Sequence, residues 1–363
     1  MAGIERTVSA LPKGTALARY CMALGASPKD TSKRIEIAER HWRNTPQVAA
    51  TLKAAVDAGG INTETWGTAL ALYGVGLELI EALRPAVIVD QIAPFMRKVP
   101  FRVRIARQTT QLGGNWVGEQ QPIAIDASSY DVAVQENYKA QLVVVFTKEV
   151  LQFSNPSAEA DLRGQLVASI ARFLDRQFLD PSVAPVLGLR PGAVTHHALA
   201  VASTGSDGDS KLAGFAAMID ALVNANTPML APYWIMRPST AINLAITQSS
   251  GGHLLFPDIR ANGGMLLGIP VLTSNSSLEQ ITLIDASQLL LSDDGNVDLA
   301  GTEEAALEMS TDVGGSPATH MTSLWQRNLF GLRFTREIAW QPLHNDGGSP
   351  ERTAGVCYMN VTY

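Results

Sequence analysis

The stretch QLGGNWVGEQQPIAIDASSYD, residues 111–131, lies between two segments that alternate like β-strands. It holds the adjacent glycines Gly113 and Gly114, the tryptophan Trp116 and scattered small apolar residues, which are too few for the core face of a sheet. The flanking alternation predicts a long hairpin, and an isolated two-stranded hairpin is only marginally stable in water. A chain with such a hairpin needs a further surface that buries it, and another chain is the expected source.

The length and composition are those of a soluble globular protein. With 363 residues the chain is long enough for about two domains, and its 46% hydrophobic and 17% charged residues are ordinary values. The start has no apolar run, and the richest apolar stretch is interrupted by Glu78 and Glu81, so neither secretion nor a membrane span is indicated. Cys21 and Cys357 lie near opposite ends, which favours free thiols in a reducing compartment and leaves a single disulfide open.

Charge is distributed unevenly along the chain. The net charge is −6, yet residues 1–53 contain nine Lys or Arg and four Asp or Glu, which is about +5. The negative total argues against a general nucleic-acid binder. The basic end is interpreted either as a solvated helical surface or as an arm that meets a polyanion or an acidic partner.

Helical patterns dominate the first 85 residues. Residues 31–57 predict two short helices interrupted near Pro46, and a further helix is predicted from Thr63 to Leu83. Beyond them, the alternation of residues 99–107 predicts a half-buried strand, and the apolar run of residues 140–146 predicts a buried strand.

The clearest helix is predicted for residues 158–179, with Ser157 as its N-cap. At 1.5 Å per residue it would be a strut of about 33 Å. Its apolar stripe consists of Leu162, Leu166, Val167, Ile170, Phe173, Leu174 and Phe178.

The rest of the chain alternates between helices and strands and predicts a compact α/β or α+β domain. The predicted elements are a helix over residues 211–226, a buried strand at YWIMR, a helix that begins at Pro238, strands within residues 265–274 and 280–291, long strand patterns from Leu324, and a last strand at VCYMNVTY.

The residues show no catalytic or metal-binding arrangement. None of the six histidines has the spacing of a metal site, and the adjacent His196 and His197 would point apart in a strand. Nucleophile-elbow, phosphate-loop and dinucleotide-binding motifs are absent from the sequence. Glu119 has no second carboxylate at a defined spacing, and Cys21 has no histidine at a recognisable one. The sequence therefore predicts no catalytic residue, no cofactor and no metal.

Six segments of the chain, in order, carry a resemblance to a known family. They are LIEALRPAVIVDQIAPFMRKVPFRV, NWVGEQQPIAI, KAQLVVVFTKEVLQFSNPSAEADLR, YWIMRPSTAINL, GGMLLGIPVLTS and SLWQRNLFGLRF. Together they resemble the major capsid proteins of tailed double-stranded DNA phages, which have the Hong Kong ninety-seven fold. The resemblance covers about residues 66–363 and depends on the order and spacing of the segments, since no single one is diagnostic.

The resemblance implies an α+β fold with a peripheral domain, a long spine helix, an extended E-loop hairpin, an axial domain and a helical N-terminal arm. The expected boundaries are residues 1–85 for a helical arm or scaffold-like segment, 86–106 and 136–205 for the peripheral domain with a spine helix at about 158–179, 107–135 for the E-loop, 206–323 for the axial domain, and 324–363 for the return to the peripheral domain.

The resemblance also implies a function, that of a structural virion protein and not an enzyme. Such proteins self-assemble into pentamers and hexamers that form an icosahedral head around double-stranded DNA. The implied partners are other copies of the chain, non-specifically contacted DNA, and the portal, scaffold or protease, and decoration proteins. Assembly is expected in the host bacterial cytoplasm, with no membrane involved.

In this family the E-loop is buried on a neighbouring subunit, which answers the need of the hairpin for a partner. The inter-subunit contacts expected from this resemblance are Trp116, Val117, Gly118, Glu119, Ile123 and Ile125. Packing of Trp116 within its own chain is the alternative.

Two features bear on maturation. Some members join an E-loop lysine to an asparagine with the help of a glutamate, but no lysine lies between Lys98 and Lys139, so Asn328 has no evident partner and no cross-link is expected. The N-terminal segment is either a scaffold-like piece that is removed or an arm that is retained, and the sequence shows no cleavage signal.

Two alternatives stay open on the sequence. An encapsulin-like nanocompartment shell would keep the fold and carry enzyme cargo. An unrelated soluble α+β enzyme would form a modest oligomer and have a pocket that gathers several titratable side chains.

Overall fold

A computed structural model describes residues 12, 15–27, 30–56, 81–108, 116–117, 130–149, 156–203, 205–225, 227–249, 251–308, 321–343 and 355–361. The chain divides into two compact units. The first unit contains residues 1–86, 140–170 and 295–336, and the second contains residues 87–139, 171–294 and 337–363.

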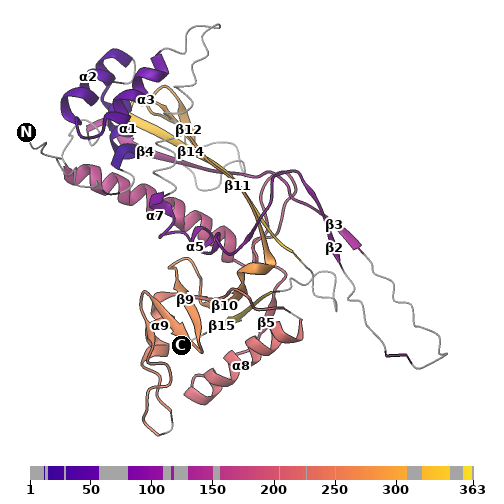
Figure 1. Cartoon of the computed structure of the whole chain (residues 1–363). Helices are drawn as coiled ribbons and strands as arrows, with labels where there is room; N and C mark the ends of the chain where they lie inside the picture. The colour runs from indigo at the N-terminus through magenta and orange to yellow at the C-terminus, as the bar shows by residue number, and fades with distance from the viewer. Residues whose placement is uncertain are drawn as a thin grey trace, which may run out of the picture. The chain divides into compact units, whose positions relative to one another are not determined.

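Three helices near the N-terminus pack against one another in the first unit: α1 (Thr15–Ala26), α2 (Thr31–His41) and α3 (Pro46–Val56) (Figure 1). The two helices predicted within residues 31–57 are confirmed, and Pro46 begins the second because a proline fits the first turn of a helix. The buried Arg19 of α1 donates from Nη1 to Asn44 Oδ1 at 2.7 Å and to Thr45 Oγ1 at 2.9 Å. The helix predicted from Thr63 lies outside the described residues except for its last turn.

A four-stranded sheet has the order β1-β11-β14-β4. Its strands are β1 (Arg97–Lys98), β4 (Lys139–Thr147), β11 (Leu289–Thr302) and β14 (Leu329–Pro342). The strand predicted for residues 140–146 is confirmed as β4, but the prediction that it is buried was wrong. Exposed and half-buried residues alternate along most of β4. Val143 is 49% exposed, and Phe146 is the one buried residue of the strand. The strand is this exposed because it lies at the edge of the sheet.

The long helix α7 (Pro156–Leu179) has 24 residues, which corresponds to about 36 Å. Leu166, Ile170, Leu174 and Phe178 form its buried stripe, as predicted, whereas Phe173 is 39% exposed and lies outside it. Ser157 is not the N-cap, because the helix already begins at Pro156.

The second unit contains a seven-stranded mixed sheet of order β5-β15-β10-β6-β9-β8-β7. Its strands are β5 (Leu199–Val201), β6 (Pro232–Met236), β7 (Ile259–Arg260), β8 (Gly263–Leu266), β9 (Ile269–Thr273), β10 (Gln280–Asp285) and β15 (Val356–Asn360). Helix α8 (Gly208–Asn224) packs on β5 and β15 (Figure 1). Helix α9 (Pro238–Ala245) packs on β7. Phe215 of α8 meets Trp234 and Phe256 edge to face, with ring centroids 5.4 and 5.6 Å apart. These aromatic contacts form the centre of the core of this sheet.

Most boundaries in this part of the chain agree with the sequence. The buried strand at YWIMR and the helix that begins at Pro238 are confirmed. Helix α8 begins three residues before the predicted Lys211, because Asp207 caps it by accepting a hydrogen bond from the Ser210 amide at 3.2 Å. The stretch 265–274 forms two strands, since Leu267 and Gly268 make a turn with φ of 51° and 78°.

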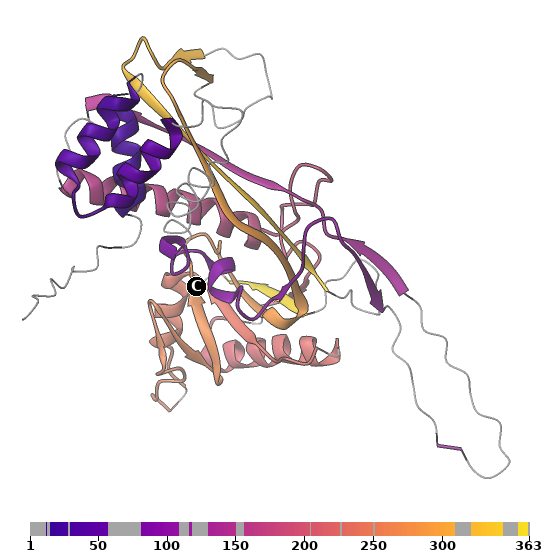
Figure 2. The same cartoon turned by 45° about the horizontal axis from the view of Figure 1, so that its top comes forward.

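A separate two-stranded ribbon consists of β2 (Arg104–Gln108) and β3 (Tyr130–Val134) (Figure 2). The single strand predicted over residues 99–107 was wrong, since a turn at residues 101–102 divides it. The Val99 amide donates to Leu291 O of β11 at 2.9 Å, whereas the Arg102 amide donates to Gln135 O at 2.7 Å. The chain changes partners between these two bonds, and Arg102 adopts a φ of 60°. Alternating side chains do not reveal such a change of partner.

Candidate functional site

The β2–β3 ribbon exposes two valines on one of its faces. The strands pair antiparallel from Arg104 opposite Val134 to Gln108 opposite Tyr130, and opposite residues share a face. Val132 and Val134 therefore lie on one face with Ala106 and the exposed Arg104, and the two valines are 55% and 41% exposed. Two strands that expose apolar side chains are weakly stable alone. The ribbon is thus suited to packing against a further surface.

Trp116 and Val117 lie between the two strands in sequence and are exposed. The Trp116 side chain is 104% exposed and Val117 is 39% exposed. The chain therefore covers none of the Trp116 ring, which runs against the alternative that Trp116 packs within its own chain. Gly118, Glu119, Ile123 and Ile125 lie outside the described residues. A fully exposed tryptophan is unusual in a soluble monomer and typical of a surface that binds another molecule.

Gln135, the residue after β3, was missed by sequence reasoning. Its side chain is 1% exposed, and neither its Oε1 nor its Nε2 has a hydrogen-bond partner in the described part of the chain. A buried amide without partners lowers stability, and such groups in native proteins call for a structural explanation. No pattern of residue types could have indicated it, because glutamine is ordinarily a surface residue.

A second exposed tryptophan, also missed by sequence reasoning, lies at the turn between β13 (Met321–Ser323) and β14. Trp325 is 69% exposed in this turn, and Asn328 ends the turn with a φ of 53°. Asn328 Nδ2 donates to Glu149 Oε1 at 2.6 Å. A hydrogen bond from its own backbone amide, and then the one from Asn328, lower the pKa of the Glu149 carboxyl. The turn is therefore fixed to the end of β4 in the first unit.

No covalent ladder is expected when assembled particles are heated in detergent. The Asn328 amide is held by Glu149, the adjacent Lys148 pairs with Glu303 at 2.9 Å, and residues 99–138 contain no lysine. An amide bond to Asn328 needs a free amine, which these contacts do not supply. Denaturing gel electrophoresis should show one band at the mass of a single chain, and bands at multiples of that mass would contradict the expectation.

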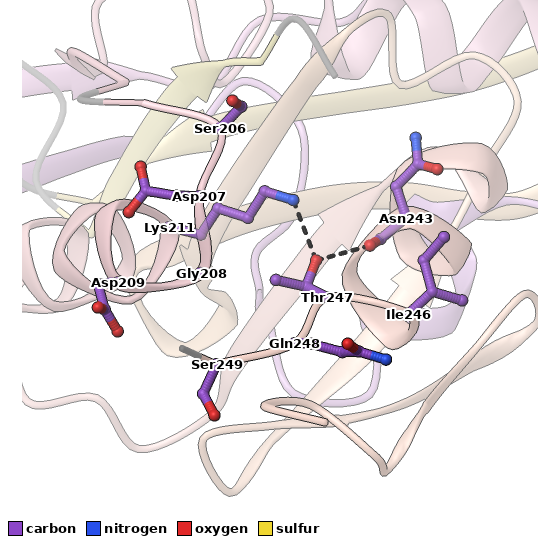
Figure 3. A pocket seen from close by; sticks show the side chains of 10 residues that line it. All are labelled: Ser206, Asp207, Gly208, Asp209, Lys211, Asn243, Ile246, Thr247, Gln248 and Ser249. Carbon is purple, nitrogen blue, oxygen red and sulfur yellow. Dashed lines mark hydrogen bonds between the residues drawn. The ribbon is translucent and has the colours of Figure 1, made fainter. Parts of the chain in front are cut away.

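A depression of about 600 Å³ lies beside the N-terminus of α8 and the end of α9 (Figure 3). Lys211 Nζ donates to Thr247 Oγ1 at 3.0 Å, and Thr247 Oγ1 donates to Asn243 O at 2.7 Å. Burial lowers the pKa of Lys211, and Asp207 opposes that shift. Asp207, Asp209 and Lys211 give the depression three titratable groups, which is what the enzyme alternative expects. However, Asp207 caps α8 and Lys211 is bonded to Thr247, so both have structural roles.

The remaining candidates for reactive groups are buried or paired. Burial raises the pKa of the free thiols of Cys21 and Cys357 to about 12, so both stay protonated. His196 and His197 lie in a turn and not in a strand, and their ring centroids are 4.4 Å apart. No group of three His, Cys, Asp or Glu side chains suited to a metal ion occurs among the described residues.

No helix in the described ranges is long and apolar enough to cross a membrane.

Comparison with known proteins decides the family. A model described as the phage capsid family matches residues 78–346. The chain belongs to the phage capsid family. It is 33% identical, over 367 aligned residues and 96% of its length, to the capsid polyprotein of Pseudomonas phage PAJU2. The chain spans about half of that relative, 54% of its length.

Solved structures agree on the fold of this phage capsid protein. The structure named Mycobacterium phage Bobi matches with a TM-score of 0.53 at 13% identity, over 75% of this chain and 90% of the other. Mycobacterium phage Adephagia matches with a TM-score of 0.52 at 15% identity and the same coverage. The fold is of the Hong Kong ninety-seven type, as the family resemblance implied. Proteins of this family are structural components of the phage virion, and so is this chain. Neither the encapsulin alternative nor the enzyme alternative is favoured.

Proposed function

We propose that the chain is the subunit of an icosahedral phage head, which it builds as pentamers and hexamers around double-stranded DNA. It acts by assembly and has no catalytic role. The observation that carries the proposal is the exposed Trp116, which lies in sequence between the two strands of a ribbon that exposes Val132 and Val134. In a shell, the same contact is repeated by every copy, so modest contacts add up to a stable particle.

In the proposed shell, the E-loop of residues 107–135 binds a neighbouring copy, with Trp116 and Val117 as anchors and Gly118, Glu119, Ile123 and Ile125 completing the contact. Residues 206–323 form the axial domain at the centre of each pentamer or hexamer. Residues 86–106, 136–205 and 324–363 form the peripheral domain. Strands β6 to β10 of the seven-stranded sheet fall within the proposed axial segment, whereas β5 and β15 of the same sheet come from the segments assigned to the peripheral domain.

The N-terminal residues 1–85 are proposed as a helical arm that contacts packaged DNA without sequence preference. Support comes from the exposed basic side chains Lys33, Arg40, Arg43 and Lys53 on or beside α2 and α3. Lys33 and Lys53 lie near Asp30 and Glu39, at 3.6 and 2.5 Å, so part of this charge is compensated. Portal, scaffold or protease, and decoration proteins are the further proposed partners, and assembly takes place in the host bacterial cytoplasm.

Electron microscopy of the full-length chain tests the proposal. The chain is expressed in a bacterium, alone and with the scaffold and protease of its phage, and the sedimenting fraction is imaged. Closed shells built from rings of five and six copies are the expected result. A chain that stays monomeric or forms only small oligomers at every salt and protein concentration, with or without these helpers, would overturn it. Enzyme cargo in place of nucleic acid inside the shells would favour the encapsulin alternative.

A further inference from the structure

A buried carboxylate joins three segments of the second unit. Asp175 of α7 is 2% exposed, and its Oδ1 accepts a hydrogen bond from the Ile88 amide at 2.8 Å. Its Oδ2 accepts a hydrogen bond from Ser274 Oγ at 2.6 Å, just after β9. One side chain therefore connects α7 to the start of α5 (Ile88–Ile92) and to the loop that follows β9.

The bond to Ile88 replaces a cap that α5 lacks. Val87 occupies the N-cap position of α5 and its side chain accepts no hydrogen bond, since valine has no polar atom to offer. The first amides of a helix have no partner within the helix, so α5 depends on Asp175 for one of them. A helix of five residues is not stable by itself, which makes this tertiary contact important for holding it in place.

The position of α5 matters because it leads to the ribbon. Residue Ile92 ends α5, β1 begins at Arg97, and the first ribbon strand begins at Arg104. The segment of residues 88–103 is therefore the root of the E-loop. A loosened α5 would let this root move relative to residues 171–179 of α7, which belong to the same unit.

The charged groups around Asp175 do not neutralise it. Asp90 from the first turn of α5 is 8% exposed and repels the Asp175 carboxylate. Arg172 and Arg176 on α7 are exposed, and Arg176 pairs instead with Asp180 at 3.5 Å. The loop after β9 contributes Ser274 and Asn275, which carry no charge. The ionised carboxylate thus lies in a buried environment without a basic partner among the described residues.

We propose that the Asp175 carboxyl is a proton-sensitive latch that holds the root of the E-loop on the spine helix. When protonated, it still accepts from the Ile88 amide, and its own hydroxyl donates to Ser274 Oγ, which can act as acceptor. The neutral form therefore keeps both contacts without the cost of a buried charge. The latch is firm when Asp175 is protonated and weaker when it is ionised.

The pH range follows from the environment. Burial raises the pKa of Asp175 to about 6, Asp90 adds to the rise, and the hydrogen bonds from Ser274 and Ile88 oppose it. In the open form Asp175 is exposed, and an exposed aspartate has a pKa of about 3.9. Between these values the closed form binds more protons than the open form, so the latch loses stability as the pH rises from about 4 to about 6 and stays weak above that.

Hydrogen exchange of the full-length chain, followed by mass spectrometry of peptides that cover residues 87–93, tests the latch. After correction for the intrinsic exchange rate, protection of these amides should be about tenfold higher at pH 5 than at pH 7.5. D175N keeps the shape without the charge and should abolish this pH dependence. D175A removes both contacts and should lower protection at both pH values.

Two further variants separate a latch from a merely structural contact. S274A removes a hydrogen bond that stabilises the ionised form, so the midpoint of the pH dependence should move to higher pH. D180N changes another buried aspartate of the same region, which bonds to Ser182 at 2.6 Å, and should keep the tenfold change. Equal protection of the wild type at pH 5 and 7.5, or an unchanged profile in D175N, would overturn the latch. Because exchange is measured within one chain, either result leaves the proposed shell function standing.

Discussion

Replacing Trp116 by alanine is expected to prevent assembly while leaving the fold of the single chain intact. The Trp116 side chain is 104% exposed, so it makes no contact in its own chain that the substitution would remove. In an interface, truncating a buried tryptophan anchor costs about 2 kcal/mol or more, which is roughly a 30-fold loss of affinity for each contact. Because every copy in a shell repeats the contact, the loss accumulates, and W116A should sediment as unassembled protein where the wild type forms particles.

The matched control is W116F, which keeps an aromatic ring and should still assemble. Thermal unfolding of unassembled W116A should give the wild-type midpoint within error. Particles of W116A at the wild-type protein concentration would show that Trp116 is no anchor, and a large fall in its unfolding temperature would show that the ring packs within its own chain after all.

Replacing Lys148 by methionine is expected to lower the free energy of unfolding by about 3 kcal/mol. Lys148 Nζ pairs with Glu303 Oε2 at 2.9 Å, and the two side chains are 17% and 6% exposed. The other carboxylate oxygen, Glu303 Oε1, has no hydrogen-bond partner in the described chain. The substitution K148M would leave a buried carboxylate without a cation, which is the costly way to break such a pair. Chemical denaturation at pH 7 measures the loss.

Lys139 on the same strand β4 provides the control. It pairs with Glu337 at 3.8 Å, with side chains 62% and 35% exposed, so K139M should change the free energy of unfolding by less than about 0.5 kcal/mol. The double variant K148M/E303M removes both charges and should recover most of the stability lost in K148M. Equal effects of K148M and K139M would mean that Glu303 is solvated.

Elements with a strong repeating pattern were predictable from the sequence. The helix α7 and the strands β4 and β6 follow from apolar residues at regular spacing, and Pro46 and Pro238 mark helix starts because proline fits the first turn. The family resemblance rested on six sequence segments and on their order and spacing. Within the site, Trp116 stood out because a single large aromatic lies in a stretch with little else to bury.

Features that depend on which segments meet were not predictable. The turn at Arg102 was missed because Val99 bonds to β11 and Arg102 bonds to Gln135, two partners far apart in sequence. The latch was missed for the same reason, since 87 positions separate Asp175 from Ile88. Ser157 is a suitable cap by residue type, but α7 already begins at Pro156, since proline fits the first turn of a helix.

The sequence by itself determined the helices, the strands and the presence of a hairpin that cannot bury itself, because periodicity and turn residues act within a few positions along the chain. Only the tertiary structure decided the exposure of Trp116 and Trp325, the orphaned amide of Gln135, the burial of the Lys148–Glu303 pair and the environment of Asp175. Burial and charge compensation depend on residues brought together from distant segments, and the linear order of residues does not specify these neighbours.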